Sequence, residues 1–188
     1  FPAFAQGSRS PNLAPGQWTW EKGPNQVAEQ PIYGSYGTRG VAAAGNMPGA
    51  RNGSVTWRDG SGKLWLFGGD GYSASGSGRL NDLWKFDPGL GQWTWISGSS
   101  DADQVGTYGS LGTPASGNVP GARFGSVSWT DASGNLWLFG GRTYLAWASS
   151  FVRLNDLWRF DPGLGQWTWM SGSIVPDRWG TYGSLGTP

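Results

Sequence analysis

A stretch of fifteen residues occurs twice in this chain, and it restricts the kind of fold that the chain can adopt. Residues 81–95 read Asn-Asp-Leu-Trp-Lys-Phe-Asp-Pro-Gly-Leu-Gly-Gln-Trp-Thr-Trp, and residues 155–169 repeat them with one change, Arg159 in place of Lys85. Two flanking motifs recur in the same order: Pro-Gly-Ala-Arg begins at 48 and 120, and Leu-Trp-Leu-Phe-Gly-Gly begins at 64 and 136. Repeats this similar stack as equivalent units, so function is expected from what the units build together.

The composition favours short aromatic strands joined by tight turns. The 188 residues include 34 Gly and 14 Trp, and only 13% are charged. The net charge is +1 and the Lys and Arg residues are dispersed, which argues against a nucleic-acid partner or an anionic membrane surface. No run of about 20 apolar residues is present, so we expect no membrane span.

Two residue types are missing from the sequence, and their absence excludes several kinds of chemistry. The chain has no Cys, so disulfides, thiolate nucleophiles and cysteine metal sites are excluded. It also has no His, the usual general base and the commonest ligand of transition metals. We therefore expect no catalytic residues, no metal site and no cofactor.

Each full unit contains four segments with the pattern of β-strands. Val55 and Trp57 alternate with smaller residues before a turn at 59–62, and the apolar run at 64–67 is expected to be a buried strand that ends at the diglycine. Two more strands are expected at 83–87 and 92–96, separated by the turn Pro-Gly-Leu-Gly. Four antiparallel strands per period are typical of a propeller blade, and we expect an all-β fold.

The order of these motifs resembles the kelch repeat of β-propellers. A diglycine, a downstream Asn-Asp-Leu-Trp and a final Trp-containing strand occur in that order twice. Kelch units are typically about 50 residues long, and these units are longer. The resemblance implies two full blades of four antiparallel strands plus an extra outer-strand segment. The expected division is an N-terminal extension at 1–16, an outer strand and connection at 17–49, blade 1 at 50–97, a connection at 98–121, blade 2 at 122–171 and the start of a further connection at 172–188.

The residues added to each unit are expected on one side of the blades, in the segments 70–80 and 142–154 and in the connections between units. Long connections on one face are where ligand or partner contacts concentrate. Residues there that differ between the units are candidates for a contact surface, because exposed aromatic rings and arginines are common in binding surfaces. These candidates are Tyr72, Arg142, Tyr144, Trp147, Phe151, Arg153, Arg178 and Trp179.

Other recurring residues have a simpler structural interpretation. The segment Tyr-Gly-Ser-Leu-Gly-Thr at 108 and 182 has a near match that begins at Tyr33, and it is expected to pack in the same way on each blade. Arg51 and Arg123 follow Gly-Ala in phase and are expected to bond to nearby carbonyl groups or to Asp. The recurring tryptophans are expected to pack between blades.

Two blades cannot close a ring, so their open faces must be covered. Either this sequence is a stretch of a longer propeller of six to eight blades, or copies of the chain join head to tail. In the second case Gln17, Trp18, Thr19 and Trp20 are the candidate inter-chain strand, completing a neighbour by strand addition. Strand addition predicts that removal of residues 1–20 abolishes assembly. The segment Ala3-x-Ala5 resembles the end of a secretory signal, and we expect an extracellular or cell-surface protein.

The sequence offers no convincing catalytic site. Galactose oxidase has kelch-like blades, but its copper site needs histidine ligands and a cysteine-linked tyrosine, which this sequence cannot supply. The carboxylates lie at turns or in the repeated strand motif and form no convincing acid and base pair. Asp101 and Asp103 alone do not make a calcium cage. An enzyme would need residues from outside this chain.

Two functions therefore remain open from the sequence. The first is a secreted, non-enzymatic structural subunit that assembles or adheres as part of an extracellular ring or fibre, with self-association or further blades of a longer chain as the partner. The alternative is a lectin-like propeller that binds carbohydrate or protein with its long-loop face. An aromatic pocket repeated in every blade would favour the alternative, and dry contacts between blades would favour assembly.

Overall fold

The fold is all-β and consists of two antiparallel sheets. The computed structural model describes residues 19–24, 30–146 and 149–185. The strands of the first sheet are β1 (Arg51–Asn52), β2 (Val55–Arg58), β3 (Leu64–Tyr72), β4 (Ser77–Asp87) and β5 (Gln92–Ser97). Those of the second are β6 (Val127–Thr130), β7 (Leu136–Leu145), β8 (Ser150–Asp161) and β9 (Gln166–Ser171). Within the described residues no helix is long and apolar enough to cross a membrane.

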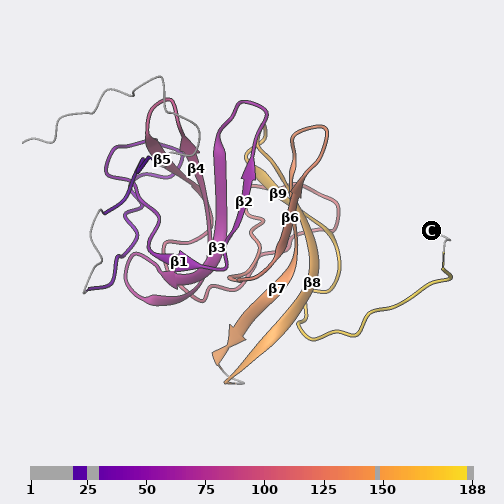
Figure 1. Cartoon of the computed structure of the whole chain (residues 1–188). Coiled ribbons are helices and arrows are strands. Elements are labelled where there is room, and N and C mark those ends of the chain that lie inside the picture. The colour runs from indigo at the N-terminus through magenta and orange to yellow at the C-terminus, as the bar shows by residue number, and fades with distance from the viewer. Residues whose placement is uncertain (1–18, 25–29, 147–148, 186–188) are drawn as a thin grey trace, which may run out of the picture.

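The two sheets have the same topology. The second sheet has the order β6-β7-β8-β9, and the first has β1-β3-β4-β5 with β2 also paired to β3. Since β1 and β2 pair with successive parts of β3, they act as one interrupted strand, and each sheet is a meander of four antiparallel strands. The prediction of an all-β chain with four strands per unit is confirmed at this level (Figure 1).

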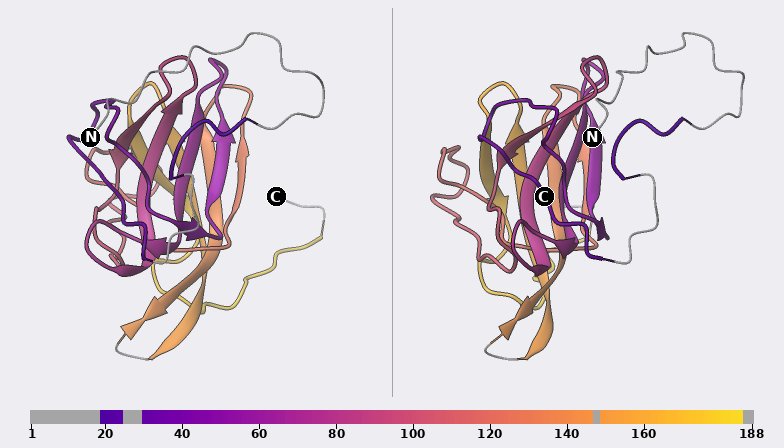
Figure 2. Two further views of the ribbon diagram at one scale, coloured as in Figure 1. Left: turned by 60° about the vertical axis from the view of Figure 1, so that its left-hand side comes forward. Right: turned by 90° about the vertical axis from the view of Figure 1, so that its left-hand side faces the viewer.

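The sequence predicted that each diglycine ends the second strand of its unit, and this prediction is wrong. Strand β3 continues through Gly68 and Gly69 to Tyr72, and the register shifts there by a bulge. Both glycines have positive φ values of 66° and 104°, which glycine reaches without a steric penalty. The segments 70–80 and 142–154 are therefore largely paired strand and not long loops. The β7–β8 hairpin projects beyond the rest of the molecule (Figure 1, Figure 2).

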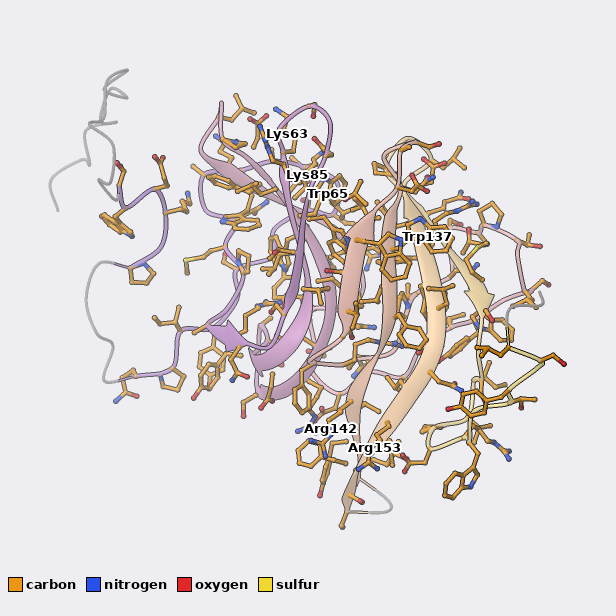
Figure 3. All side chains as sticks on the ribbon, turned by 45° about the vertical axis from the view of Figure 1, so that its right-hand side comes forward. Lys63, Trp65, Lys85, Trp137, Arg142 and Arg153 are labelled. Carbon is orange, nitrogen blue, oxygen red and sulfur yellow. The ribbon has the colours of Figure 1, made fainter. Side chains whose placement is uncertain are left out.

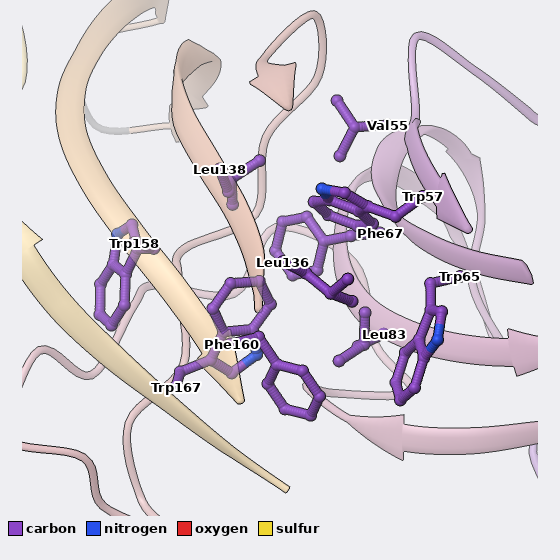
Figure 4. Close-up of a cluster of buried hydrophobic side chains, with 10 residues drawn as sticks. All are labelled: Val55, Trp57, Trp65, Phe67, Leu83, Leu136, Leu138, Trp158, Phe160 and Trp167. Carbon is purple, nitrogen blue, oxygen red and sulfur yellow. The ribbon is translucent and has the colours of Figure 1, made fainter. Parts of the chain in front are cut away.

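The sheets pack face to face around an aromatic core. Trp65 lies 5.5 Å from Phe160 and Phe67 lies 5.4 Å from Trp167, measured between ring centroids, and both pairs join the first sheet to the second. Such ring contacts add to the stabilisation from apolar burial. The core consists of Val55, Trp57, Trp65, Phe67 and Leu83 from the first sheet and Leu136, Leu138, Trp158, Phe160 and Trp167 from the second (Figure 4).

Polar contacts near this core fix how the two sheets are aligned. The indole nitrogen of Trp57 donates to the carbonyl of Trp137 at 3.1 Å. The backbone N–H groups of Gly69 and Gly125 donate to the carbonyls of Arg123 and Gly53 at 2.8 Å each. Strands β2 and β6 come into contact here. The sheet-to-sheet contact thus has a defined register in addition to apolar burial.

Candidate functional site

The residues predicted as a contact surface are only partly brought together. Figure 3 shows Arg142 and Arg153 on the projecting β7–β8 hairpin, which also carries Tyr144 and Phe151. Tyr72 lies at the end of β3 and pairs with Tyr33 at 5.5 Å. Arg178 and Trp179 follow the second sheet and are exposed, and Trp147 lies outside the described residues.

A cluster of aromatic rings and arginines covers the β7–β8 hairpin. The Phe151 ring lies 5.3 Å from that of Tyr144 and 5.8 Å from that of Phe124. The guanidinium of Arg79, from the first sheet, sits over the Tyr144 ring at 4.7 Å, and that of Arg142 sits 5.9 Å from Phe151. Such contacts hold the rings in place by cation–π attraction. We name Tyr144, Phe151, Phe124, Arg79 and Arg142 the hairpin cluster.

The sequence interpretation missed Arg79, although a signal for it was present. Arg79 pairs with Asp103 at 2.6 Å, and 74 residues later Arg153 faces Asp177 at 3.9 Å. The arginine and the aspartate therefore recur together in the two units. The first pair is partly buried, whereas the Arg153 side chain is 77% exposed. Only the first pair is positioned to support the hairpin cluster.

A pocket of about 330 Å³ opens beside this hairpin in the second unit. Its walls come from the connection at 103–106, the strands β7 and β8 and the residues Ile174 and Pro176. The first unit has a pocket of about 480 Å³ that includes Arg51 and Tyr72, the counterparts of Arg123 and Tyr144. There the Tyr33 ring packs on Tyr72, and the N–H of Gly34 donates to the carbonyl of Ser73 at 3.0 Å. The two pockets therefore share part of their lining and differ in the rest.

A buried polar clamp does recur in both units. In the second unit Arg123 makes two hydrogen bonds of 2.7 Å to the Asp156 carboxylate, which also accepts from Tyr108 and Trp158 at 2.7 Å each. The same guanidinium donates to the carbonyls of Gly121 and Gly140. Arg51, Asp82, Tyr36 and Trp84 form the corresponding set in the first unit. The expectation that Arg51 and Arg123 bond to carbonyl groups and Asp is confirmed.

The tyrosine of the clamp in the first unit differs from the one that the motif match indicated. Tyr36, not Tyr33, occupies the position of Tyr108, since each hydroxyl donates to the clamp aspartate of its own sheet. The bridge between Ser35 and Met47 likewise corresponds to the bridge between Thr107 and Val119. The sequence match of Tyr33 with Tyr108 is therefore out of register by three residues.

The charges within the clamp are held in place by burial and pairing. Burial, together with the Asp156 carboxylate, raises the pKa of Tyr108 far above its ordinary value, so that its hydroxyl stays protonated. Burial alone would raise the pKa of Asp156, but the hydrogen bonds and charge of Arg123 hold that pKa below its usual value. A bidentate ion pair of this kind, in which every polar atom has a hydrogen-bond partner, links the connection at 98–121 to β7 and β8. We interpret it as a structural element.

The remaining carboxylates noted in the sequence are also used within the fold. Asp131 accepts hydrogen bonds from Trp137, Asn135 and Ser133 in the β6–β7 turn, which lower its pKa to about 2. Asp101 accepts from Ser75, and Asp103 pairs with Arg79. Among the residues that the structure describes, no three carboxylates or other ligand side chains gather where they could hold a metal ion.

The outer face of the second sheet exposes apolar side chains to solvent. On the face of the second sheet that points away from the first, Val127 is 60% exposed and Phe139 is 43% exposed. The residues at the same places in the first sheet, Val55 and Phe67, are 7% and 1% exposed because the second sheet covers them. Apolar side chains on an open face of this kind are typical of a binding surface.

The candidate inter-chain strand is only partly described. Gln17 and Trp18 lie outside the described residues, whereas Thr19 and Trp20 are exposed and belong to no strand. Each sheet has its fourth strand, β5 or β9, within the described residues, and Thr19 and Trp20 pair with neither.

Comparison with known proteins gives little further information. No family model matches the chain, and no curated protein matches it. Among solved structures 82 chains match, and the structure of YjhT is 20% identical, with a TM-score of 0.48. That match covers 69% of this chain and 40% of YjhT, so this chain spans less than half of YjhT.

Proposed function

We propose that this chain is a segment of a secreted, non-enzymatic, kelch-like propeller that acts as an assembly or adhesion subunit of an extracellular ring or fibre. Its blades are completed by neighbouring chains or by the rest of a longer protein. The repeated order of diglycine bulge, Asn-Asp-Leu-Trp strand and final Trp strand supports the kelch-like assignment. The small-residue motif Ala3-x-Ala5 supports export.

One observation carries the proposed role in assembly. The outer face of the second sheet presents to solvent the same apolar residue types that the first sheet buries between the sheets. A monomer that leaves such a face uncovered exposes apolar area that association would remove from water. Contacts that repeat head to tail close into a ring when the rotation permits, and otherwise they form a filament.

The contacts of the polar residues support a structural role over a catalytic one. The buried carboxylates and tyrosines of the two clamps donate to or accept from one another, and the turn aspartates hold their own hairpins. The hydrogen bonds of these groups within the repeats account for their positions. No bound substrate is needed to explain why they lie there.

The alternative is a binding site for carbohydrate or protein at the hairpin cluster. The observation in its favour is the 330 Å³ pocket of the second unit, which is lined by Tyr144. Aromatic rings are suited to stacking on sugar faces. Binding to immobilised glycans that is lost in Tyr144→Ala and kept in Tyr72→Ala would support this alternative, and equal loss in both variants would argue against it.

Deletion of residues 1–20 tests how the chain assembles. If strand addition joins the chains, the shortened protein keeps its β-sheet circular dichroism but remains at the mass of one chain. If the sheet faces join the chains, the particle of the shortened protein contains as many chains as the particle of the full-length protein. Analytical ultracentrifugation of both proteins at one concentration distinguishes the two modes.

A further inference from the structure

We propose that the outer face of the second sheet docks the outer face of the first sheet of another copy, and that this contact repeats the one between the two sheets within the chain. This inference rests on the proposed role in assembly and specifies the partner and the surface. Its occupant is a second copy of this chain. The internal sheet-to-sheet contact serves as the template.

The two open faces carry the same residues as the two halves of the buried contact. The buried half on the first sheet consists of Val55, Trp57, Trp65, Phe67 and Leu83, and the open face of the second sheet has Val127, Trp129, Trp137, Phe139 and Leu157 at the same places. The buried half on the second sheet consists of Leu136, Leu138, Trp158, Phe160 and Trp167, and the open face of the first sheet has Leu64, Leu66, Trp84, Phe86 and Trp93. All ten positions are identical in residue type.

The strand pairing places each open set on a single face. Val127 is opposite Phe139 and Trp129 is opposite Trp137 in the antiparallel ladder, so their side chains point to the same side. Phe139 is in turn opposite Leu157. The same rule places Leu64 with Phe86 on the first sheet. The outer face of the first sheet and the outer face of the second sheet therefore carry different residues and are complementary to each other.

The exposed fractions show which positions of the outer faces lack a neighbour. On the first sheet Trp84 and Phe86 are buried, at 0% and 6%, and Leu66 and Trp93 border a pocket shared with residues 22–24, so Leu64 is the most exposed of the five. Leu64 is 43% exposed, whereas its counterpart Leu136, which is covered by the first sheet, is fully buried. Next to Leu64 lies a groove of about 390 Å³, bordered by Leu66, Trp93 and Arg58. The corresponding Leu138 and Trp167 lie inside the internal core. The groove is the place where the second sheet of another copy would pack.

Hydrogen bonds of the internal contact also have counterparts on the open faces. Trp57 donates to the carbonyl of Trp137, and the corresponding donor and acceptor are Trp129 and the carbonyl of Trp65 in the second copy. In the chain as described, the Trp129 ring instead stacks on Trp137 at 5.7 Å with an angle of 6° between the planes. Docking would therefore turn the Trp129 indole toward the partner.

The proposed contact between copies does not require the C-terminal segment 179–185 of one copy to bind the other. Each second copy already closes its own first clamp with Tyr36, which donates to Asp82. Tyr182 repeats the sequence around Tyr108 but is 93% exposed. The contact proposed here is thus between sheet faces, with no exchange of the segment 179–185.

Head-to-tail docking makes a specific prediction for two charge variants. Leu64→Arg spoils only the open face of the first sheet, and Phe139→Asp spoils only that of the second. Each variant alone should lose self-association by a factor of about 30 or more, as expected for a side chain at the centre of an interface. An equimolar mixture should recover one contact, between the intact first sheet of Phe139→Asp and the intact second sheet of Leu64→Arg. The expected product is a capped dimer of twice 20.0 kDa.

Light scattering after size-exclusion chromatography measures these masses, and Leu164→Asp is the matched control. Leu164 is also an exposed leucine, but it lies in the β8–β9 turn and on neither face. Near-ultraviolet circular dichroism checks that the variants keep the wild-type packing. Because Leu64 and Phe139 are substantially exposed in the single chain, folding should not depend on them.

Four results would overturn the inference. Continued assembly of Leu64→Arg alone, or a mixture that stays monomeric, would show that the two faces do not pair head to tail. Assembly of both variants together with loss of assembly on deletion of residues 1–20 would assign the contact to strand addition, and the proposed assembly role would stand. A wild-type protein that stays monomeric at every concentration would remove the proposed role itself.

Discussion

Substitution of Asp156 by Ala is expected to lower the free energy of unfolding by about 3–5 kcal/mol, since it leaves the buried guanidinium of Arg123 without its charge partner. The indole of Trp158 and the hydroxyl of Tyr108 lose an acceptor as well. A domain of this kind is stable by only about 5–15 kcal/mol, so the variant is expected to lose a large part of its stability. Urea unfolding followed by tryptophan fluorescence measures the loss.

Two further variants show whether the charge pair explains this effect. Asp101→Ala removes an exposed carboxylate that accepts from Ser75 and should change the free energy of unfolding by less than about 0.5 kcal/mol. The double variant Arg123→Met with Asp156→Leu removes both charges and should recover a large part of the loss. A double variant as unstable as Asp156→Ala would contradict the explanation by an unpaired charge.

The same clamp should make stability depend on pH in the acid range. The pKa of Asp156 is held low in the folded chain, whereas an unfolded aspartate titrates near about 3.9. Its contribution to stability is therefore complete above the unfolded pKa and is lost as the pH falls through the folded pKa. In Asp156→Ala this component of the acid dependence should be missing.

The second large effect is expected at Trp167. This residue is 1% exposed and packs on Phe67 of the other sheet and on Phe160 and Trp158 of its own. Trp167→Ala should cost about 3–5 kcal/mol, because it removes a large buried ring and leaves a cavity between the sheets. The corresponding Trp93→Ala should cost clearly less in the monomer, since no second sheet covers Trp93.

Trp167→Phe separates the packing of this ring from its polar atom. The indole nitrogen of Trp167 is buried and has no hydrogen-bond partner in the described structure. A phenylalanine keeps an aromatic ring and removes that unpaired donor, so its cost should stay well below that of alanine. All three variants should be compared by urea unfolding at one protein concentration. Equal losses for Trp93→Ala and Trp167→Ala would contradict the assignment of Trp167 to the contact between sheets.

The strand pattern could be predicted from the sequence because residue spacing determines it directly. The alternation at Val55 and Trp57 and the turn at 59–62 gave strands close to those observed. The diglycine was interpreted as a strand end, since glycine is more often a terminator than a bulge within a strand. The pairing of residues 69–72 with residues 77–80 across the hairpin shows that the strand continues.

The candidate site was harder to predict, because it depends on contacts between the units. Arg142, Tyr144 and Phe151 were found as residues that differ between the repeats, but their partner Arg79 comes from the other sheet. Comparison of the two units identified Arg51 and Arg123 and the kind of partner each would have, but not which aspartate or carbonyl group. The match of Tyr33 with Tyr108 was wrong because Tyr36 lies three residues away in the same motif, and only its bond to Asp82 distinguishes the two tyrosines.

The most direct test of the account is the molar mass of the purified wild-type protein, measured by light scattering over a series of dilutions. The account predicts particles heavier than the 20.0 kDa chain, which break down toward that mass as the protein is diluted. Electron microscopy of the same samples would then distinguish closed rings from filaments. A constant mass of one chain at all concentrations would contradict the claim that the open sheet faces bind further copies.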